Sequence, residues 1–229
     1  RLFPLQRTRG RANWANRPLL WLCRYGDIPR FFYHRHSHFL HQGARGTMNE
    51  EKRSELLSYF LKEEYGVLPS FSDVHVYYEV VDEFPDALKA HRKDLRCHLE
   101  RKGRYTSFGF DLFVPPKPKG VFIFLCNRPV GQISKKEIDP NRDLKSSFYP
   151  MEAILKRGYA CCAFLTAEVA EDKAGFRFGM NSLFPDINHE DPHSYGTLLF
   201  WAKGFSLIID YLKQDPLTKD LPLATVGHS

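Results

Sequence analysis

The spacing of hydrophobic positions changes twice along the chain. Between Glu50 and Tyr65 they recur every three to four residues, which predicts a helix, and Gly66 is expected to end it. Apolar and polar residues then alternate, and this spacing predicts half-buried antiparallel strands. These strands are expected at Asp73–Asp82, Asp94–Arg101 and Arg104–Val114, the last two forming a hairpin.

Beyond the proline-rich linker 115–120 the apolar runs become continuous, as in strands that are buried on both faces. Three such strands are expected, at Val121–Cys126, Tyr159–Leu165 and Leu221–Val226. Two helices are predicted between them, at Pro150–Arg157 and Tyr195–Lys213. The apolar face predicted for the longer helix consists of Leu198, Trp201, Ala202, Phe205, Ile208, Ile209 and Leu212.

Strands that alternate with helices after a leading antiparallel hairpin indicate an α/β fold. We therefore expect a doubly wound, mostly parallel sheet whose chemistry lies at the carboxyl ends of its parallel strands. Those ends are the residues after Cys126, Leu165 and Val226. The stretch Thr166–His193 is predicted to be a long loop, and loops of that length in compact domains are usually functional or disordered.

The last predicted strand runs directly into Gly227-His228-Ser229. A strand followed by G-x-S is the first half of a nucleophile elbow, in which the Ser hydroxyl is exposed on a sharp turn at the edge of the sheet. Ser229 is accordingly the candidate catalytic nucleophile, and an ordinary strand end followed by a loop is the alternative. His228 leaves such a turn in a different direction from Ser229, so we expect it to pack beside the elbow rather than act as the base.

The formal charge of +6 is concentrated in residues 1–47, which hold nine Arg, no Lys and a single acid, Asp27. This leader has a net charge of +8, so residues 48–229 carry −2. The leader has no helical or alternating pattern, and it ends just before Met48, which is followed by residues typical of a true amino terminus. We therefore expect residues 1–47 to be disordered or not native.

An organelle transit peptide and a nucleic-acid-binding arm are the other roles open to this Arg-rich leader. Within it, the alternating residues His34, His36 and His38 would share one face of a strand, as a metal site requires. No Cys or carboxylate ligand lies close by, so we expect an unstructured tail, no metal and no nucleic-acid partner.

The five cysteines form no CxxC pair, and the adjacent Cys161 and Cys162 would point to opposite faces of a strand as two small core residues. This usage favours a reducing compartment, and with Met48 as the start there is no secretory signal, so we expect a cytoplasmic protein. The longest apolar runs have the length of a strand, and no membrane partner is expected.

Short motifs follow one another in a characteristic order along the second half of the chain. They are Arg157-Gly158-Tyr159-Ala160, Gly175-Phe176-Arg177-Phe178-Gly179, Ser182-Leu183-Phe184-Pro185, Tyr195-Gly196-Thr197-Leu198, Trp201-Ala202-Lys203-Gly204, Asp210-Tyr211-Leu212, Asp215-Pro216 and Val226-Gly227-His228-Ser229. In these motifs the chain resembles the bacterial glucuronoyl esterase and acetylxylan esterase-like branch of the α/β-hydrolases. The resemblance covers roughly Val121 to Ser229, and across Asp73–Val114 only the layout matches.

The resemblance implies that residues 48–229 are the amino-terminal part of one α/β-hydrolase domain, truncated after the nucleophile strand. It implies a serine esterase that needs no cofactor and cleaves carboxylic esters on plant cell-wall polysaccharide, either the glucuronoyl ester or acetyl groups on xylan. Ser229 would be the nucleophile, and the Arg that usually follows it in the family would help to hold the oxyanion. The acid and the base would come later still, because α/β-hydrolases run Ser, then Asp or Glu, then His. Without a base to activate Ser229, the chain by itself is expected to be inert.

The resemblance also gives a context for further candidate site residues. Asn127 comes just after the first buried strand, where α/β-hydrolases place the second oxyanion-hole contribution, and a polar strand-end turn is the alternative. Arg128 and Arg177 are candidates for binding a uronate carboxylate through two hydrogen bonds, and ordinary surface arginines are the alternative. Trp201 could face a sugar, but its place in the apolar helix face favours core packing.

The pair His189 and His193 flanks Glu190-Asp191 in the long predicted loop, where a solvated loop is expected rather than a metal cluster. Other functions stay open at this stage. Gly-His-Ser is shared with lipases, dienelactone-type hydrolases and peptidases, and an Arg directly after Ser229 would favour the polysaccharide esterase. A pseudoenzyme or an inactive fragment is the third possibility, with the unpaired edge of the last strand as an aggregation site.

Overall fold

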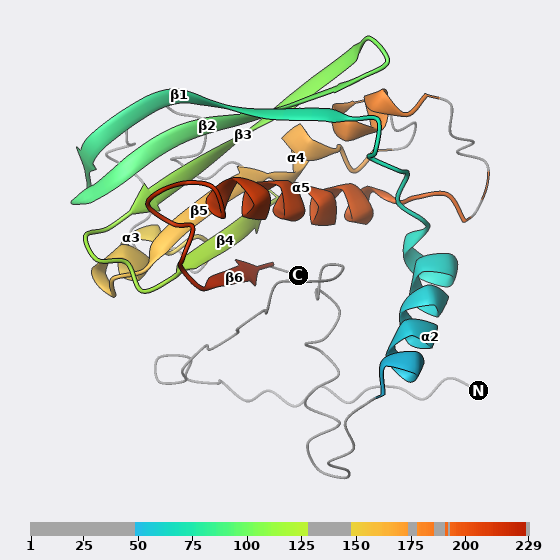
Figure 1. Ribbon diagram of the computed structural model, residues 1–229, viewed down its shortest axis with the longest axis horizontal. Coiled ribbons are helices and arrows are strands. Elements are labelled where there is room, and N and C mark those ends of the chain that lie inside the picture. Colours follow the sequence, from blue (N-terminus) through green and yellow to red (C-terminus); the bar gives the residue numbers. More distant parts are fainter. Residues whose placement is uncertain (1–48, 128–147, 174–177, 186–190, 192, 228–229) are drawn as a thin grey trace.

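The computed structural model describes residues 49–127, 148–173, 178–185, 191 and 193–227. One mixed sheet of six strands, in the order β1-β2-β3-β5-β4-β6, forms its centre (Figure 1). The strands are β1 (His75–Ala87), β2 (Ala90–Arg101), β3 (Arg104–Val114), β4 (Val121–Cys126), β5 (Ala160–Leu165) and β6 (Leu223–Val226). The Arg-rich leader and its histidines lie outside the described residues.

The sheet combines an antiparallel and a parallel part. β1, β2, β3 and β5 pair antiparallel with one another in that order, whereas β4 pairs parallel with both β5 and β6. The predicted hairpin is confirmed, because Lys102 and Gly103 turn with φ of 49° and 76° between β2 and β3. Two consecutive residues with positive φ are typical of the tight turn whose twist matches that of paired strands.

The helices also follow the predicted order. They are α2 (Glu50–Phe60) with a π-helical last part η3 (Leu61–Tyr65), α3 (Met151–Lys156), α4 (Thr166–Val169), the 3-10 helix η4 (Gly179–Leu183) and α5 (Thr197–Leu212). Asn49 caps α2 by accepting a hydrogen bond from the amide of Lys52 at 2.8 Å, and Gly66 ends η3 with φ of 77°. The stretch predicted as one long loop, Thr166–His193, contains α4 and η4, so that prediction was wrong in its described part.

The two faces of the sheet carry separate hydrophobic clusters, and the adjacent cysteines of β5 belong to one each. Cys162 packs in the cluster that includes Phe164 and residues of α5, while Cys161 packs in the cluster that includes Met151 and Leu155 of α3. Both cysteines are fully buried, so their predicted role as core residues on opposite faces is confirmed. Figure 1 shows α5 lying across the front of the sheet.

The buried face of α5 agrees with the predicted one at Phe205, Ile208 and Leu212, which are buried, but differs from it elsewhere. Leu198 is 53% exposed, whereas its neighbours Leu199 and Phe200 are buried. The buried stripe instead follows Phe200, Gly204 and Ile208, because Gly204 brings the helix so close to β5 that an added Cβ would lie 2.9 Å from the Phe164 ring. Most positions of α5 are apolar, so the pattern of hydrophobic residues alone could not show which side of the helix is buried.

Trp201 packs against the core cluster and donates its indole N–H to the carbonyl of Ala170 at 2.8 Å, which confirms its predicted core role. None of the described helices has the length and apolar composition that a membrane span requires.

Candidate active site

The three parallel strands end together at one edge of the sheet. Cys126 of β4 lies opposite Leu165 of β5, and Phe124 of β4 lies opposite Val226 of β6. The residue that follows β4 is Asn127, which is exposed at this edge. The carboxyl ends of parallel strands are where open α/β sheets bind their ligands.

The register relates the predicted nucleophile to the predicted oxyanion-hole residue. Val226 precedes Ser229 by three positions in the sequence, and its partner Phe124 precedes Asn127 by three. Ser229 and Asn127 therefore follow two neighbouring strands, and each comes three residues after a member of the same residue pair. Ser229, His228, Arg128 and Arg177 themselves lie outside the described residues, as do His189 and Glu190.

The segment after β5 is fixed across this edge by contacts to two other elements. Thr166 begins α4 directly after the last residue of β5. The carboxylate of Glu168 in α4 accepts a hydrogen bond from the backbone amide of Gly109 in β3 at 2.8 Å. On the other side, the carbonyl of Ala170 accepts the indole N–H of Trp201 in α5. Residues 166–170 are therefore fixed at this edge between β3 and the first turns of α5, and we call this segment, together with η4, the wall of the edge.

The 3-10 helix η4 continues this wall, and it depends on a glycine. Gly179 has φ of 62°, and an added Cβ would lie 2.2 Å from the carbonyl oxygen of Val169 in α4. Only glycine fits this position, because both the backbone conformation and the close approach exclude a side chain. Gly179 is also the last residue of the Gly175–Gly179 motif on which the resemblance was based.

The β2–β3 hairpin holds η4 from its other side. Arg101 donates from Nη1 to the carbonyl of Leu183 at 2.9 Å, and its guanidinium carbon lies 4.6 Å from the centre of the Phe184 ring. Arg104 donates to the carbonyl of Ser182 at 3.3 Å. The hairpin and the wall thus form one unit at the edge where β4, β5 and β6 end.

The start of α5 lies at the same edge, where it meets the end of η3. The amide of Gly196 donates to the carbonyl of Tyr65 at 2.9 Å, and a Cβ on Gly66 would lie 1.8 Å from the carbonyl oxygen of Ser194. His193, one of the two histidines weighed as a metal ligand, places Nδ1 2.9 Å from the carbonyl of Lys62. Its backbone amide donates to Asp191 at 2.9 Å, so both residues serve this junction.

A described cysteine stands next to Asn127, but it is not a nucleophile. Burial raises the pKa of the Cys126 thiol to about 12, and the negative charge of Asp111 adds to the rise. Burial likewise raises the pKa of Cys97 and of Cys161 to about 12. These thiols stay protonated at neutral pH, and the thiolate is the reactive form. These three cysteines are therefore not candidates for a catalytic nucleophile.

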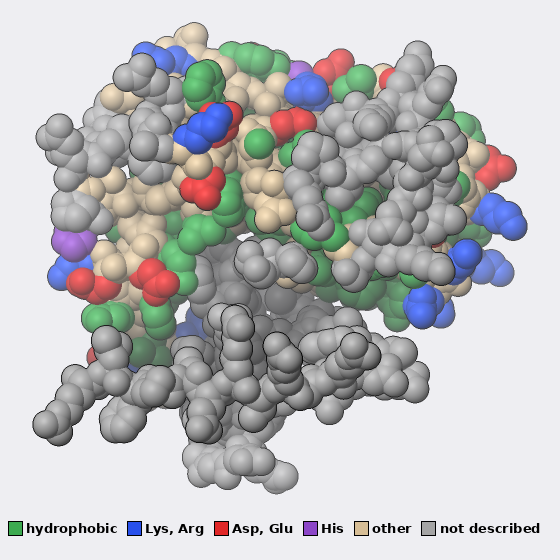
Figure 2. Space-filling view, turned by 180° about the vertical axis from the view of Figure 1, so that it is seen from behind, with side chains coloured by type: hydrophobic (Ala, Val, Ile, Leu, Met, Phe, Trp, Pro, Cys, Tyr) green, Lys and Arg blue, Asp and Glu red, His purple; other side chains and the backbone are tan. Residues whose placement is uncertain are grey.

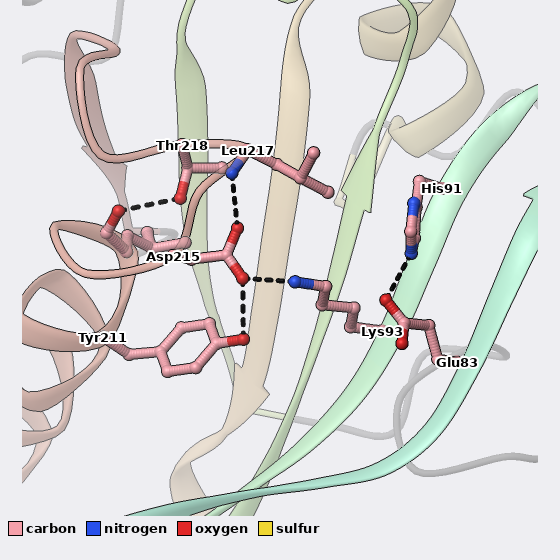
Figure 3. Close-up of polar contacts among 8 residues, drawn as sticks. Glu83, His91, Lys93, Tyr211, Asp215, Leu217 and Thr218 are labelled. Atoms are coloured by element: carbon pink, nitrogen blue, oxygen red, sulfur yellow. Dashed lines mark hydrogen bonds and ion pairs between the residues drawn. The ribbon is translucent and has the colours of Figure 1, made fainter.

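The connection from α5 to β6 is anchored by a buried carboxylate. Asp215, which is 4% exposed, accepts hydrogen bonds from the Tyr211 hydroxyl and the Leu217 amide, both at 2.9 Å, and forms an ion pair with Lys93 of β2 (Figure 3). Burial raises the pKa of Asp215, but the contacts with Lys93, the Leu217 amide and Tyr211 lower it by more. The pKa of Asp215 therefore lies below its ordinary value. The anchored loop fixes where β6 enters the sheet, and therefore where β6 delivers Gly227.

Sequence reasoning missed three of these supporting residues. Asp215-Pro216 was noted as a motif of the resemblance but not as an anchor of the loop, although an Asp ahead of a turn is also a common backbone cap. Glu168 and Gly179 fell within the stretch predicted as a loop, and no local pattern marks their contacts with Gly109 and Val169. Only the three-dimensional arrangement brings these partners together.

Solved structures are similar to this chain, although no protein-family model and no curated protein matches the sequence. One structure of a glucuronoyl esterase from Solibacter usitatus is 25% identical with a TM-score of 0.65, and another is 24% identical with a TM-score of 0.64. A promiscuous CE15 esterase from a marine bacterial metagenome is 20% identical with a TM-score of 0.62. Each match covers 79% of this chain and 52% of the other.

The chain therefore has the α/β-hydrolase fold in the form found in glucuronoyl esterases, and both the predicted fold class and the resemblance are confirmed. It spans about half the length of these solved proteins.

Proposed function

We propose that this chain carries the nucleophile of a serine carboxylic-ester hydrolase that acts on esters of plant cell-wall polysaccharide. The preferred bond is the glucuronoyl ester, and the acetyl ester of xylan is the alternative within the same reaction class. The observation that carries the proposal is the position of Ser229, three residues beyond Val226 of β6, in a chain with the fold of glucuronoyl esterases.

The chemistry assigns roles to the residues at the edge. The Ser229 hydroxyl would attack the ester carbonyl and form a tetrahedral intermediate, while a histidine takes its proton. Hydrogen-bond donors at the Asn127 end of β4 would stabilise the oxyanion of that intermediate. The histidine and its carboxylate partner are expected after Ser229 in the intact protein, in the order usual for α/β-hydrolases.

Two arginines are proposed to recognise the uronate. Arg128 follows Asn127 directly, and Arg177 precedes Phe178 and η4 in the wall of the edge, so both are close in sequence to residues of the proposed site. The carboxyl group of the substrate is esterified, so a guanidinium donates to its carbonyl oxygen, and paired donors match both oxygens only in the glucuronate product. An acetyl ester offers no uronate carboxyl group to these arginines, so they would distinguish the two substrates.

The test of the nucleophile is hydrolysis by the intact protein that contains this chain, with a glucuronate methyl ester and a chromogenic acetyl ester as substrates. We expect Ser229→Ala to lower kcat/KM by at least about 10³-fold on both esters, because removal of a catalytic serine leaves only binding and oxyanion stabilisation. Ser206→Ala is the matched control, since the Ser206 hydroxyl donates to the Ala202 carbonyl within α5 at 3.2 Å. Full hydrolysis by Ser229→Ala would contradict the proposal.

The test of substrate preference uses Arg177→Ala. We expect the KM for the glucuronate ester to rise about tenfold and the KM for the acetyl ester to stay unchanged, because one charge-assisted contact contributes about 1.5–3 kcal/mol. Arg157→Ala is the control, since Arg157 is exposed and donates to the Ala153 carbonyl at the far end of β5. An equal change on both esters would assign Arg177 to structure rather than to uronate recognition. A preference for lipid esters or peptides in the parent protein would instead favour another α/β-hydrolase activity.

A further inference from the structure

The amino ends of the three parallel strands meet at the edge of the sheet opposite the candidate active site. The chain enters these strands through three short segments, 115–120 before β4, 156–159 before β5 and 217–222 before β6. The backbone joins them to one another. The amide of Lys119 donates to the carbonyl of Gly158 at 2.9 Å, and the amide of Val121 donates to the carbonyl of Pro222 at 2.9 Å. The three segments therefore form one continuous surface.

This surface is strongly cationic, although residues 48–229 as a whole have a net charge of −2. The three segments contain one acid, Asp220, and five cations, which are Lys117, Lys119, Lys156, Arg157 and Lys219. All five cations are exposed, and we call them the cationic edge. On the right of Figure 2, Lys and Arg side chains gather at the end of the molecule that lies on the left of Figure 1, where the three segments are.

The cations of this edge lack the carboxylate partners that lysines have elsewhere in the fold. An ion pair with Asp or Glu is formed by each of Lys52, Lys62, Lys93, Lys102 and Lys173. Among the residues that the structure describes, no ion pair joins a member of the cationic edge to a carboxylate. Lys119 donates instead to the carbonyl of Arg157 at 3.2 Å. The positive charges at this edge are therefore not neutralised by described side chains.

The backbone beneath the cations is held in place. An added Cβ on Gly120 would lie 3.0 Å from the carbonyl oxygen of Pro222. Lys213, which follows α5, donates from Nζ to the carbonyl of Leu221 at 3.2 Å and adds a further positive charge beside segment 217–222. Since β4 lies between β5 and β6, and neighbouring strands are about 4.8 Å apart, the segments place their cations side by side in steps of roughly that length.

We propose that the cationic edge binds a polyuronate, a linear polysaccharide that carries one carboxylate on each sugar unit. A row of cations without partners complements a row of anions. The step from one strand to the next is similar to the step from one sugar unit to the next along such a polymer. The choice of a plant polyuronate, of which polygalacturonate is the type, rests on the proposed function, because the proposed substrate lies in the plant cell wall.

The side chains of the edge favour carboxylates over phosphates. Four of the five cations are lysines, whose ammonium is a point charge that suits a single carboxylate. Arginine is the preferred residue for phosphate and nucleic acid, because its planar fork matches two oxygens. Tyr159 is the only aromatic residue of the three segments, and its half-buried ring packs against Phe122 with 5.3 Å between centroids. The edge therefore offers no open ring for stacking on a nucleic-acid base.

The cationic edge is separate from the proposed nucleophile. β4 has six residues, so the two edges of the parallel strands are about 20 Å apart. A polymer bound at the cationic edge leaves the candidate active site open. Such binding would keep the enzyme close to the wall polysaccharide and raise the local concentration of its esters.

Fluorescence anisotropy of a labelled oligogalacturonate with the intact protein that contains this chain tests the inference and needs no catalysis. The test variant combines Lys117→Gln, Lys156→Gln and Lys219→Gln, because these side chains are exposed and form no hydrogen bond or ion pair with described residues. We expect its Kd to be about tenfold higher at low salt, since three weak charge contacts are lost together. Added salt should weaken binding by the parent protein, because it screens exposed charges.

The matched control combines Lys62→Gln, Lys102→Gln and Lys173→Gln, which change the net charge equally but lie outside the cationic edge. We expect its Kd to stay within about twofold of the parent value. An equal rise in Kd for this control, no binding of oligogalacturonate, or equal binding of neutral xylo-oligosaccharides would overturn the inference. Lys156→Gln alone, with an expected rise of about twofold, decides the matter if the triple variant does not fold.

Other polyanions serve as competing ligands. Tighter binding of a DNA duplex, or of vesicles that contain phosphatidylglycerol, with the same loss in the triple variant, would overturn the inference and assign the edge to nucleic acid or to a membrane surface. The proposed function is tested separately. The triple variant should hydrolyse the small glucuronate methyl ester as the parent does, and Ser229→Ala should bind oligogalacturonate as the parent does. Failure of either proposal is therefore visible without the other.

Discussion

Gly179 illustrates how single residues shape the edge where the parallel strands end. Its φ of 62° and the 2.2 Å approach of the Val169 carbonyl to an added Cβ leave room for hydrogen alone. Gly103 in the hairpin turn has a similar φ of 76°, but an added Cβ would meet nothing within 4 Å. Substitutions at these two glycines therefore separate the loss of stability caused by the backbone conformation from the loss caused by a steric clash.

We expect Gly179→Ala to lower the free energy of unfolding by at least about 2 kcal/mol and Gly103→Ala by about 1 kcal/mol, since only the first adds a clash to the backbone strain. Urea unfolding of the two variants measures the difference. Equal losses would mean that η4 moves away from α4 without cost, and that the wall of the edge is not rigid.

Asn127 tests the oxyanion-hole prediction. The residue is exposed and directly follows β4, so Asn127→Ala should leave the melting temperature unchanged. If its side chain faces the developing oxyanion, kcat of the intact protein falls about 10²-fold with KM nearly constant, because an oxyanion donor acts in the transition state. Unchanged kcat would return Asn127 to the role of a polar strand-end turn.

For single residues, the sequence predicted burial correctly where the alternation along a strand determines which face of the sheet a side chain lies on. Cys161 and Cys162 alternate on β5, and alternation alone assigns them to opposite core clusters. It failed for Leu198, because α5 is apolar on nearly all sides and Gly204 sets the contact with β5. The site residues Ser229, Arg128 and Arg177 remain predictions.

Among the elements, the connection between α5 and β6 has the greatest influence on the proposed elbow. Asp215 ties this connection to β2 through Lys93, and the side chains of Asp215 and Lys93 are 2% and 11% exposed. Thr218 adds a hydrogen bond from its hydroxyl to the carbonyl of Leu212 at 2.8 Å, as Figure 3 shows. These contacts hold the loop that leads into β6, which pairs with β4 from Leu223 opposite Val121 to Val226 opposite Phe124.

We expect Asp215→Ala to lower the free energy of unfolding by about 3 kcal/mol, because it leaves the ammonium of Lys93 buried without its partner. Tyr211→Phe removes one of several hydrogen bonds to the same carboxylate and should lower it by about 1 kcal/mol. Denaturant unfolding measures both values. A loss below that of Tyr211→Phe would show that the ion pair does not hold the loop.

The pH dependence of stability provides an independent check on Asp215. Its pKa is lower in the folded state than in the unfolded chain, so its stabilising contribution is present above the unfolded value of about 4 and is lost as the pH falls through the folded pKa. The difference in stability between the parent chain and Asp215→Asn should therefore shrink as the pH is lowered below about 4. A difference that stays constant as the pH falls would mean that these contacts do not hold the Asp215 carboxylate in its charged form.

The order and type of the elements could be predicted from periodicity, but their junctions could not. The strand Val121–Cys126 has the predicted bounds, since its apolar run is continuous and a Pro-rich linker precedes it. The stretch after Leu165 was predicted as a loop because α4 and η4 have four and five residues, too few to show a helical period. Their stability comes from contacts with β3 and α5, which no local pattern contains.

For the whole molecule, sheet order brings the proposed chemistry to one edge of the sheet. β4 lies between β5 and β6, so the ends of all three strands meet, and the antiparallel strands extend the sheet past this edge. The crossovers that bring β6 beside β4 involve positions about 100 residues apart, and the sequence predicted only that such a sheet forms. The fold is shared with glucuronoyl esterases, and the ester that is cleaved remains the proposal.

The most direct test of the central claim is covalent labelling of the intact protein with a fluorophosphonate, followed by mass spectrometry of the peptides. The account predicts one modified residue, Ser229, and loss of the label in Ser229→Ala but not in Ser206→Ala. A fluorophosphonate reacts with a serine only when a base activates it, so the label reports the nucleophile itself. Labelling at another serine, or no labelling of a protein that hydrolyses the glucuronate ester, would contradict the account.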